Sequence, residues 1–252
     1  MIKERKRTYF VSDMHLKFDK SKITLERKRK FADFLSTLPE DTKEIVLLGD
    51  IFDFWYEWKY VVPSYHFDLF CLFSKLIGSG IKITYVAGNH DFMLGRYLKE
   101  EVGIECIEDE IVIKQGNIRI WASHGDGLAE PDKGYRFMKK VLRSPVCNFL
   151  FRTFIHPDLA VKIASIASKT SRRHRKSAKT GINEYLKFAK KKFSEGYDVV
   201  ITGHRHFPQR TVMQEGVFVN TGDWMKHFSY AVFDGKKISI GKYDDKEENT
   251  KE

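Results

Sequence analysis

Five short apolar segments, each followed at once by a polar cluster, constrain the fold of this chain more than any other feature. They span residues 8–12, 44–48, 82–87, 117–122 and 198–202. Short continuous apolar runs are typical of strands that are covered on both faces, as in parallel sheets. The stretches 25–38 and 66–77, which separate the first three segments, have helical character and are long enough for crossover helices. The pattern therefore predicts an α/β fold.

The second half of the chain has a different pattern. Residues 134–195 contain no good strand, so we expect helices inserted between the fourth and fifth apolar segments. Three apolar stretches separated by glycine turns between residues 210 and 243 predict an antiparallel meander. The expected organisation is a single domain over residues 1–243, a helical cap at 134–195 within it, and a charged, disordered tail at 244–252.

Composition narrows the class of protein. Hydrophobic residues make up 42% of the 252 and charged residues 31%, which excludes a disordered, collagen-like or disulfide-rich chain. No apolar run approaches the roughly 18 residues of a membrane span, and none near the start suits a signal peptide. The three cysteines, Cys71, Cys106 and Cys147, are far apart, which indicates a reducing cytoplasm and argues against a disulfide framework or a cysteine zinc site.

The clusters that end the five segments are rich in aspartate and histidine. Because the carboxyl ends of neighbouring strands meet at one edge of an open α/β sheet, where ligands bind, we expect these clusters to meet in space. Adjacent glycines would let the backbone approach the site closely. The side chains suited to bind a metal are Asp13, His15, Asp50, Asn89, His124, His204 and His206.

The number and type of these ligands favour a centre of two cations. Imidazole nitrogens with carboxylate or amide oxygens suit a divalent cation, with Mn²⁺ as the first choice and Fe²⁺ or Zn²⁺ as alternatives. Seven ligands exceed the needs of one tetrahedral zinc, whereas two cations that share a carboxylate would use all of them. Two cations roughly 3.5–4 Å apart clamp a phosphoryl group and activate water at neutral pH. Each cluster alone is more often an ordinary turn, so the hypothesis depends on their joint occurrence at strand ends.

The positive charge is concentrated in one stretch. Eleven basic residues and one acidic residue, Glu184, lie between residues 162 and 192, which equals the whole formal net charge of +10. Such a field attracts phosphates, nucleic acid or anionic lipid headgroups. We interpret residues 171–176 as facing phosphate, and residues 187–192 as a solvated helix face.

Together, the clusters resemble the complete signature of the calcineurin-like metallophosphoesterases. The matching motifs are Asp13-x-His15, Gly49-Asp50-x-x-Asp53, Gly88-Asn89-His90-Asp91, His124-Gly125-Asp126 and Gly203-His204-x-His206. The resemblance implies a four-layer sandwich of two mixed β-sheets flanked by helices, with a dinuclear centre at one edge. It implies a first metal held by Asp13, His15, Asp50 and His206, and a second held by Asp50 (bridging), Asn89, His124 and His204.

Segments 12–16, 49–55, 124–128, 132–135 and 222–224 also resemble the narrower family of UDP-2,3-diacylglucosamine pyrophosphohydrolases. These enzymes cleave a nucleotide-linked glycolipid of lipid A biosynthesis at the inner face of the bacterial inner membrane, and a helical cap receives the acyl chains. The resemblance implies UMP and an acylated sugar 1-phosphate as products, and a cytoplasmic enzyme that is peripheral on that membrane. One position departs from it, because His90 stands where the best-known members carry arginine; histidine is the residue of generic metallophosphoesterases.

The expected catalytic residues are His90 and Asp91. His90 would stabilise or protonate the departing oxygen, and Asp91 would orient its ring. For Asp53 and Asp91, capping of a turn and orientation of metal ligands stay open as alternatives. The predicted contacts to the nucleotide-sugar headgroup are Asn89, Asp132, Tyr135, Arg172, Lys176 and Lys179; for the last three, a plain surface role is equally consistent.

An apolar cluster within the insertion bears on the choice of substrate. It comprises Val146, Phe149, Leu150, Phe151, Phe154 and Ile155, and continues at helical spacing through Leu159, Ile163 and Ile166. Helix packing would explain part of it, but beside the basic stretch it also fits a lipid slot with a cationic rim, or a helix on an anionic membrane. A nuclease or cyclic phosphodiesterase is an alternative, since the basic stretch suits nucleic acid equally well. The apolar cluster argues against nucleic acid, and the full ligand set argues against a non-catalytic interaction module.

Overall fold

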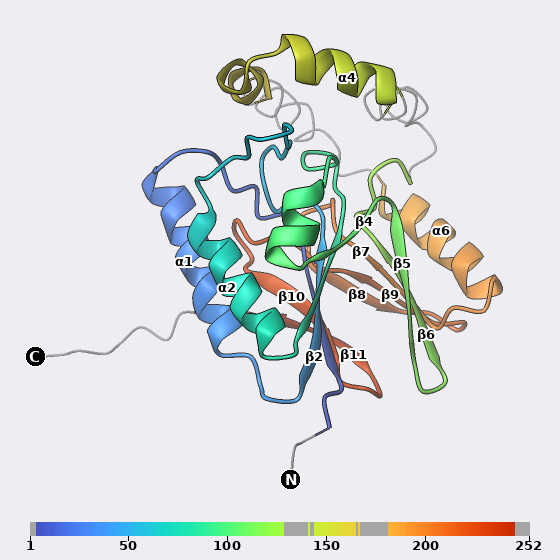
Figure 1. Ribbon diagram of the computed structural model, residues 1–252. Coiled ribbons are helices and arrows are strands. Elements are labelled where there is room, and N and C mark those ends of the chain that lie inside the picture. The colour runs from blue at the N-terminus through green and yellow to red at the C-terminus, as the bar shows by residue number, and fades with distance from the viewer. Residues whose placement is uncertain (1–3, 129–140, 142–143, 165, 167–180, 245–252) are drawn as a thin grey trace, which may run out of the picture.

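Two mixed β-sheets face each other at the centre of the molecule (Figure 1). The computed structural model describes residues 4–128, 141, 144–164, 166 and 181–244. The first sheet has the order β11-β10-β1-β2-β3-β4, and the second has the order β5-β6-β7-β9-β8. The first sheet contains β1 (Arg7–Val11), β2 (Thr42–Leu48), β3 (Lys82–Val86), β4 (Glu105–Ile107), β10 (Ser229–Phe233) and β11 (Ile238–Lys242). The second contains β5 (Glu110–Gln115), β6 (Ile118–Ser123), β7 (Val199–Thr202), β8 (Gln209–Val212) and β9 (Val217–Asn220).

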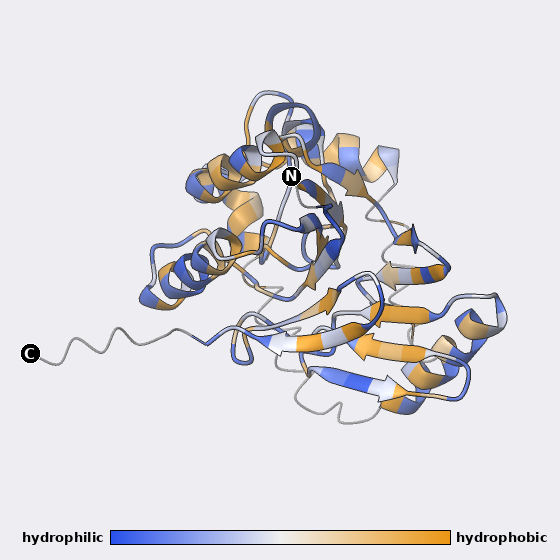
Figure 2. Ribbon diagram, turned by 90° about the horizontal axis from the view of Figure 1, so that it is seen from below, coloured by the Kyte–Doolittle hydropathy of each residue, from blue (hydrophilic) through white to orange (hydrophobic). Residues whose placement is uncertain are grey.

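The central strands are buried on both faces, as their continuous apolar character predicts. Side chains such as Phe10 and Val46 from the first sheet pack against Ile120, Ile201 and Val219 from the second. Figure 2 shows this as largely hydrophobic colouring along most strands, whereas the edge strand β8, with alternating exposure, is partly hydrophilic.

Helices cover the outer faces of both sheets, which completes the four layers. The helix α1 (Lys22–Ser36), capped at its start by the Ser21 hydroxyl, packs with α2 (Phe67–Gly78) on the first sheet. A short π-helical turn, η1 (Tyr97–Val102), joins the same core through Leu98 and Val102. The helix α6 (Ile182–Ser194) covers the second sheet, where its Tyr185, Ala189 and Phe193 contact Trp121, Val200 and Phe218. The predicted four-layer α/β sandwich is confirmed.

The predicted meander over residues 210–243 is wrong in one respect. Its strands β8 and β9 are antiparallel, and so are β10 and β11, but the two pairs belong to different sheets. β9 pairs parallel with β7 in the second sheet, whereas β10 pairs antiparallel with β1 in the first sheet. The connection between them is anchored by Trp224, which is fully buried against Phe31 and Phe34 of α1. A tertiary contact with α1 therefore separates strands that follow one another in the sequence.

The described parts of the predicted insertion are helical. They comprise α4 (Pro145–Phe154), a segment at residues 157–164, and α6, which packs on the second sheet. On α6, Lys187, Lys190 and Lys191 are exposed, which agrees with a solvated face, while the Lys192 ammonium lies 5.1 Å from the Trp121 ring. Residues 171–176 and 245–252 lie outside the described residues. No helix in the described part combines the length and the apolar character that crossing a bilayer requires.

Candidate metal centre

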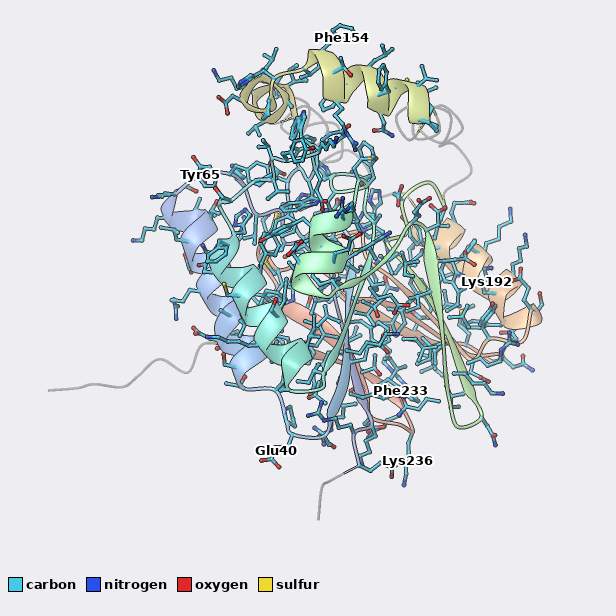
Figure 3. All side chains as sticks on the ribbon, in the orientation of Figure 1. Glu40, Tyr65, Phe154, Lys192, Phe233 and Lys236 are labelled. Carbon is cyan, nitrogen blue, oxygen red and sulfur yellow. The ribbon has the colours of Figure 1, made fainter. Side chains whose placement is uncertain are left out.

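The polar clusters meet where strands of both sheets end. β1, β2 and β3 contribute the loops that begin at Ser12, Gly49 and Ala87, and β6 and β7 contribute those at His124 and Gly203. In an open sheet these clusters would share a single edge; here they lie at adjacent edges of two facing sheets. Figure 1 shows α4 at this end of the molecule. In Figure 3, Phe154 marks α4, whereas Glu40 and Lys236 mark the opposite end.

The backbone of this centre is held in an uncommon conformation. Among the described residues, six other than glycine have positive φ, and five of them are predicted metal ligands. These are Asp13 (56°), His15 (48°), Asp50 (54°), His204 (66°) and His206 (56°). Left-handed backbone costs an L-residue of order 1–2 kcal/mol, so the surrounding structure must over-determine these positions. All five residues lie within four positions of the end of β1, β2 or β7.

Glycines allow the loops to pack backbone against backbone. A Cβ at Gly49, where φ is +73°, would lie 2.5 Å from Gly88 Cα and 2.8 Å from His124 Nδ1. A Cβ at Gly88 would lie 2.3 Å from Asp50 Oδ1. Any side chain at either glycine would push apart the loops that carry Asp50, Asn89 and His124.

One group of ligands forms around Asp13 and His15. His206 Nε2 lies 3.3 Å from Asp13 Oδ1, and its ring stacks on that of His15 with centroids 5.2 Å apart. His15 Nε2 lies 3.9 Å from Asp13 Oδ1 and 3.5 Å from Asp50 Oδ2. Asp13 is itself fixed through its other oxygen, which accepts hydrogen bonds from the Ser12 hydroxyl and the His204 amide. One ligand atom from each of Asp13, His15 and His206 lies within 4.8 Å of the others, a spacing that a single cation could bridge.

A second group forms around His124. Its Nδ1 donates to the carbonyl oxygen of Leu48 at 2.8 Å, which leaves the lone pair of the neutral ring on Nε2. That Nε2 lies 3.4 Å from Asp50 Oδ2, 3.1 Å from Asn89 Oδ1 and 3.1 Å from His204 Nδ1. Two ring nitrogens so close suit a common electrophile, either a shared proton or a cation. Asp50 Oδ2 faces both groups, as a bridging carboxylate would.

Unpartnered atoms and charge indicate that the centre fits a cation. Asp13 Oδ1, His15 Nε2, Asp50 Oδ2 and His90 Nε2 are buried and have no hydrogen-bond partner in the described part of the chain. Burial opposes the charge of Asp50, yet the His124 and His90 rings hold the pKa of Asp50 well below its usual range. Burial also opposes the charge of His124, yet the carboxylates of Asp50 and Asp13 raise the pKa of His124 to about 10. The cluster therefore attracts positive charge, and its donor set suits divalent metals.

Asp53, and not Asp91, contacts the His90 ring. His90 Nδ1 lies 3.1 Å from the carbonyl oxygen of Asp53, and His15 Nδ1 lies 3.3 Å from the Asp53 carboxylate. The Asp91 carboxylate instead accepts hydrogen bonds from the amides of Asp50, Phe52 and Gly88 and from the Tyr85 hydroxyl. Burial and the charge of Asp50 raise the pKa of Asp91 to about 6. The prediction that Asp91 orients His90 is therefore wrong: Asp91 ties the loops after β2 and β3 together.

Replacing Asp53 by Asn is expected to weaken cation binding by about 10–100-fold, because a carboxylate that orients a ligating histidine also raises its basicity. Titration of the metal-free protein with Mn²⁺ measures this affinity. Asp33→Asn is the matched control, since Asp33 is exposed on α1 and pairs with Arg29. Equal affinity in wild type and Asp53→Asn would assign Asp53 to turn formation alone.

Some predicted substrate contacts lie in parts of the chain that the structure does not describe, and two supporting residues were not predicted. Asp132, Tyr135, Arg172, Lys176 and Lys179 lie outside the described residues. Sequence reasoning missed Tyr85, which looks like an ordinary residue of an apolar strand but bonds Asp91. It also missed Thr221, whose hydroxyl lies 2.7 Å from that of Ser12, behind Asp13. Neither residue belongs to a motif, so no local signal marks them.

The helix α4 attaches to the loop that follows Asp53. The Phe151 ring lies 4.8 Å from that of Tyr56, and the Tyr56 hydroxyl donates to the Asn148 carbonyl oxygen at 3.2 Å. None of the α4 residues is buried. The segment that carries Asp53 thus also supports the helix of the insertion.

The comparisons with known proteins agree with this architecture. A family model described as calcineurin-like phosphoesterase matches residues 6–208. A Porphyromonas gingivalis protein named UDP-2,3-diacylglucosamine hydrolase is 29% identical over 262 residues, covering 96% of this chain and all of the relative. Proteins of the same name from Pseudomonas savastanoi and Haemophilus influenzae are each 26% identical; the matches cover 93% and 89% of this chain and 94% and 93% of those proteins.

The family match spans most of the chain. The groups of side chains that could hold a metal ion all lie within the matched residues. This chain belongs to the calcineurin-like phosphoesterases and is a metal-dependent hydrolase.

Proposed function

We propose that this chain hydrolyses the diphosphate bond of UDP-2,3-diacylglucosamine to give UMP and the acylated sugar 1-phosphate. The name shared by relatives that match nearly its whole length supports the substrate class. The proposal rests on one structural observation, the apolar surface of α4 at the end of the molecule where the candidate metal centre lies.

That surface consists of large apolar side chains that the described part of the chain leaves exposed. On α4, Val146 is 68%, Phe149 66%, Leu150 46% and Phe154 73% exposed. Leu159, Ile163 and Ile166 continue the exposed apolar side chains into the next segment. A contiguous apolar surface of this kind marks a binding site for apolar matter, and acyl chains attached to a sugar phosphate would supply it.

Two divalent cations, Mn²⁺ by preference, would occupy the two ligand groups. The first would be held by Asp13, His15, Asp50 and His206, and the second by Asp50, Asn89, His124 and His204. When bound, such cations polarise a phosphoryl group and activate water for attack on phosphorus.

The protein's own groups orient the substrate and move the proton. His90 donates its Nδ1 proton to the Asp53 carbonyl oxygen, because a carbonyl can only accept, and so directs Nε2 toward the centre. Because Nδ1 keeps its proton, only the imidazolium form carries a second proton on Nε2; in that form Nε2, 4.0 Å from Asp50 Oδ2, can protonate or hydrogen-bond the departing oxygen. The Asn89 side chain, beside His124, would contact the phosphate as well. The residues outside the described part, Asp132, Tyr135, Arg172, Lys176 and Lys179, keep their predicted role at the headgroup.

The same surface supports a location. An apolar helix next to a stretch that carries the chain's whole positive excess suits a peripheral position on an anionic membrane. For an enzyme that acts on a lipid precursor, this would be the cytoplasmic face of the bacterial inner membrane.

The decisive experiment compares UDP-2,3-diacylglucosamine with UDP-N-acetylglucosamine, which has the same diphosphate and no long chains. We expect kcat/KM at least about 100-fold higher for the acylated substrate, since each buried CH₂ contributes about 0.8 kcal/mol. A Phe149→Ser/Phe154→Ser double variant should lose most of this preference while its kcat on the short substrate is retained. Arg29→Ser on α1 is the surface control.

Two outcomes would contradict the proposal. Equal rates on the two nucleotide sugars would show that α4 does not contribute acyl-chain binding. Faster hydrolysis of single-stranded DNA than of either would favour the nuclease alternative, in which the basic stretch follows a nucleic acid backbone.

A further inference from the structure

One cation beside the metal centre has no role in the arrangement described so far. Arg205 lies between His204 and His206 in the loop after β7, and its side chain is half-buried. The guanidinium lies 5.6 Å from the Tyr185 ring centroid, over the ring, and Nη1 donates to Gln209 Oε1 at 3.3 Å. An aromatic ring and an amide oxygen thus hold the guanidinium in a fixed position.

The guanidinium has no acidic partner in the described part of the chain, where no carboxylate lies within 4.0 Å of it. A half-buried cation without a counter-charge leaves N–H donors and positive charge uncompensated. Arg7, by contrast, lies 3.1 Å from the carboxylate of Asp41. An anionic group of a ligand would compensate Arg205.

Its neighbours place Arg205 on the side of the second ligand group. Tyr185, which supports the guanidinium, donates its hydroxyl proton to the Gly125 carbonyl oxygen at 2.8 Å, directly after His124 in the chain. Gly125 follows the end of β6, and Tyr185 lies in the first turn of α6. Arg205 therefore lies, through Tyr185, beside the loop that carries His124 of the second ligand group.

We propose that Arg205 binds the second phosphate of a diphosphate substrate, the one that is not attacked. A guanidinium offers two parallel N–H donors that match two phosphate oxygens, and such charge-assisted bonds are strong. This inference rests on the proposed function in one respect, that the substrate carries two linked phosphates. It assigns to Arg205 the preference for diphosphates over simple phosphodiesters.

The test uses UDP and UMP as competitive inhibitors of bis(p-nitrophenyl) phosphate hydrolysis by the metal-loaded enzyme. In wild type we expect UDP to bind more tightly than UMP by roughly 10–100-fold, the value of one or two charge-assisted hydrogen bonds. In Arg205→Met this ratio should fall to within about twofold, and Arg205→Lys should recover only part of it because an ammonium cannot bind bidentately. Lys191→Met, which removes one exposed charge from α6, should keep the wild-type ratio.

The inhibitor ratio separates this inference from the proposed function. If the acylated nucleotide sugar is no substrate but Arg205→Met still abolishes the preference for UDP, the inference holds and the proposed substrate is wrong. If the acylated nucleotide sugar is hydrolysed while Arg205→Met keeps the wild-type ratio of UDP to UMP affinity, Arg205 does not bind the second phosphate. An equal loss of ratio in Lys191→Met would also overturn it, because general surface charge would then explain the preference.

Discussion

Replacing Asp50 by Asn is expected to reduce kcat by more than about 1,000-fold, since metal stabilisation of the transition state is worth several kcal/mol and each 1.4 kcal/mol is tenfold. Asp50 Oδ2 faces His15 at 3.5 Å and His124 at 3.4 Å, so one carboxylate serves both ligand groups. Asparagine keeps the size of the side chain, and its oxygen can still accept the hydrogen bond from the His90 amide. It removes the shared negative charge, and bound metal should fall from two ions to one or none.

Metal content of the purified protein and hydrolysis of bis(p-nitrophenyl) phosphate measure the two effects separately. Asp41→Asn is the matched control, because Asp41 is also buried but pairs with Arg7 in the turn before β2. Thermal unfolding shows whether each variant folds. An Asp50→Asn enzyme that is folded, keeps two metals and retains wild-type kcat would rule out a bridging role for this carboxylate.

The sequence predicts which side chains meet at this centre but not which residues support them. Hydrophobic runs identify the five central strands, and the strand-end rule brings Asp13, Asp50 and His124 together from distant positions. The left-handed backbone at five ligands leaves no such signal: aspartate and histidine adopt it more readily than most residues, but neither residue type by itself specifies it.

The roles of Asp53 and Asp91 show where sequence proximity misleads. Asp91 is the neighbour of His90, so it is the natural candidate to orient that ring. In the turn after β3, however, the Asp91 carboxylate receives backbone amides and the Tyr85 hydroxyl. Asp53, distant in sequence, faces His90 because the loops after β2 and β3 run side by side from paired parallel strands. Pairing of strands, which the sequence does not specify, decides which acid serves which histidine.

Replacing His90 by Ala is expected to lower kcat/KM by about 100-fold or more for phosphodiesters with poor leaving groups, the usual range for a positioned general acid. The effect should shrink as the leaving group improves, because a stable anion departs without a proton. His90 has the geometry for this role: Nδ1 is engaged by the Asp53 carbonyl oxygen, and Nε2 is buried, faces the centre and has no hydrogen-bond partner among the described residues.

A series of phosphodiesters, with p-nitrophenyl, phenyl and then methyl leaving groups, measures the dependence of log kcat/KM on leaving-group pKa. The slope should be shallow in wild type and steep in His90→Ala, with His227→Ala as the control; His227 lies 3.1 Å from Asp223 and is not part of either ligand group. Parallel slopes with a constant loss would show that His90 stabilises phosphate and gives no proton.

Because the leaving group of a nucleotide diphosphate is itself a phosphate, a good leaving group, the same reasoning predicts only a modest effect of His90→Ala on the nucleotide sugar. A histidine at this position would then serve the proposed reaction mainly as a hydrogen-bond donor, a role that arginine can also fill.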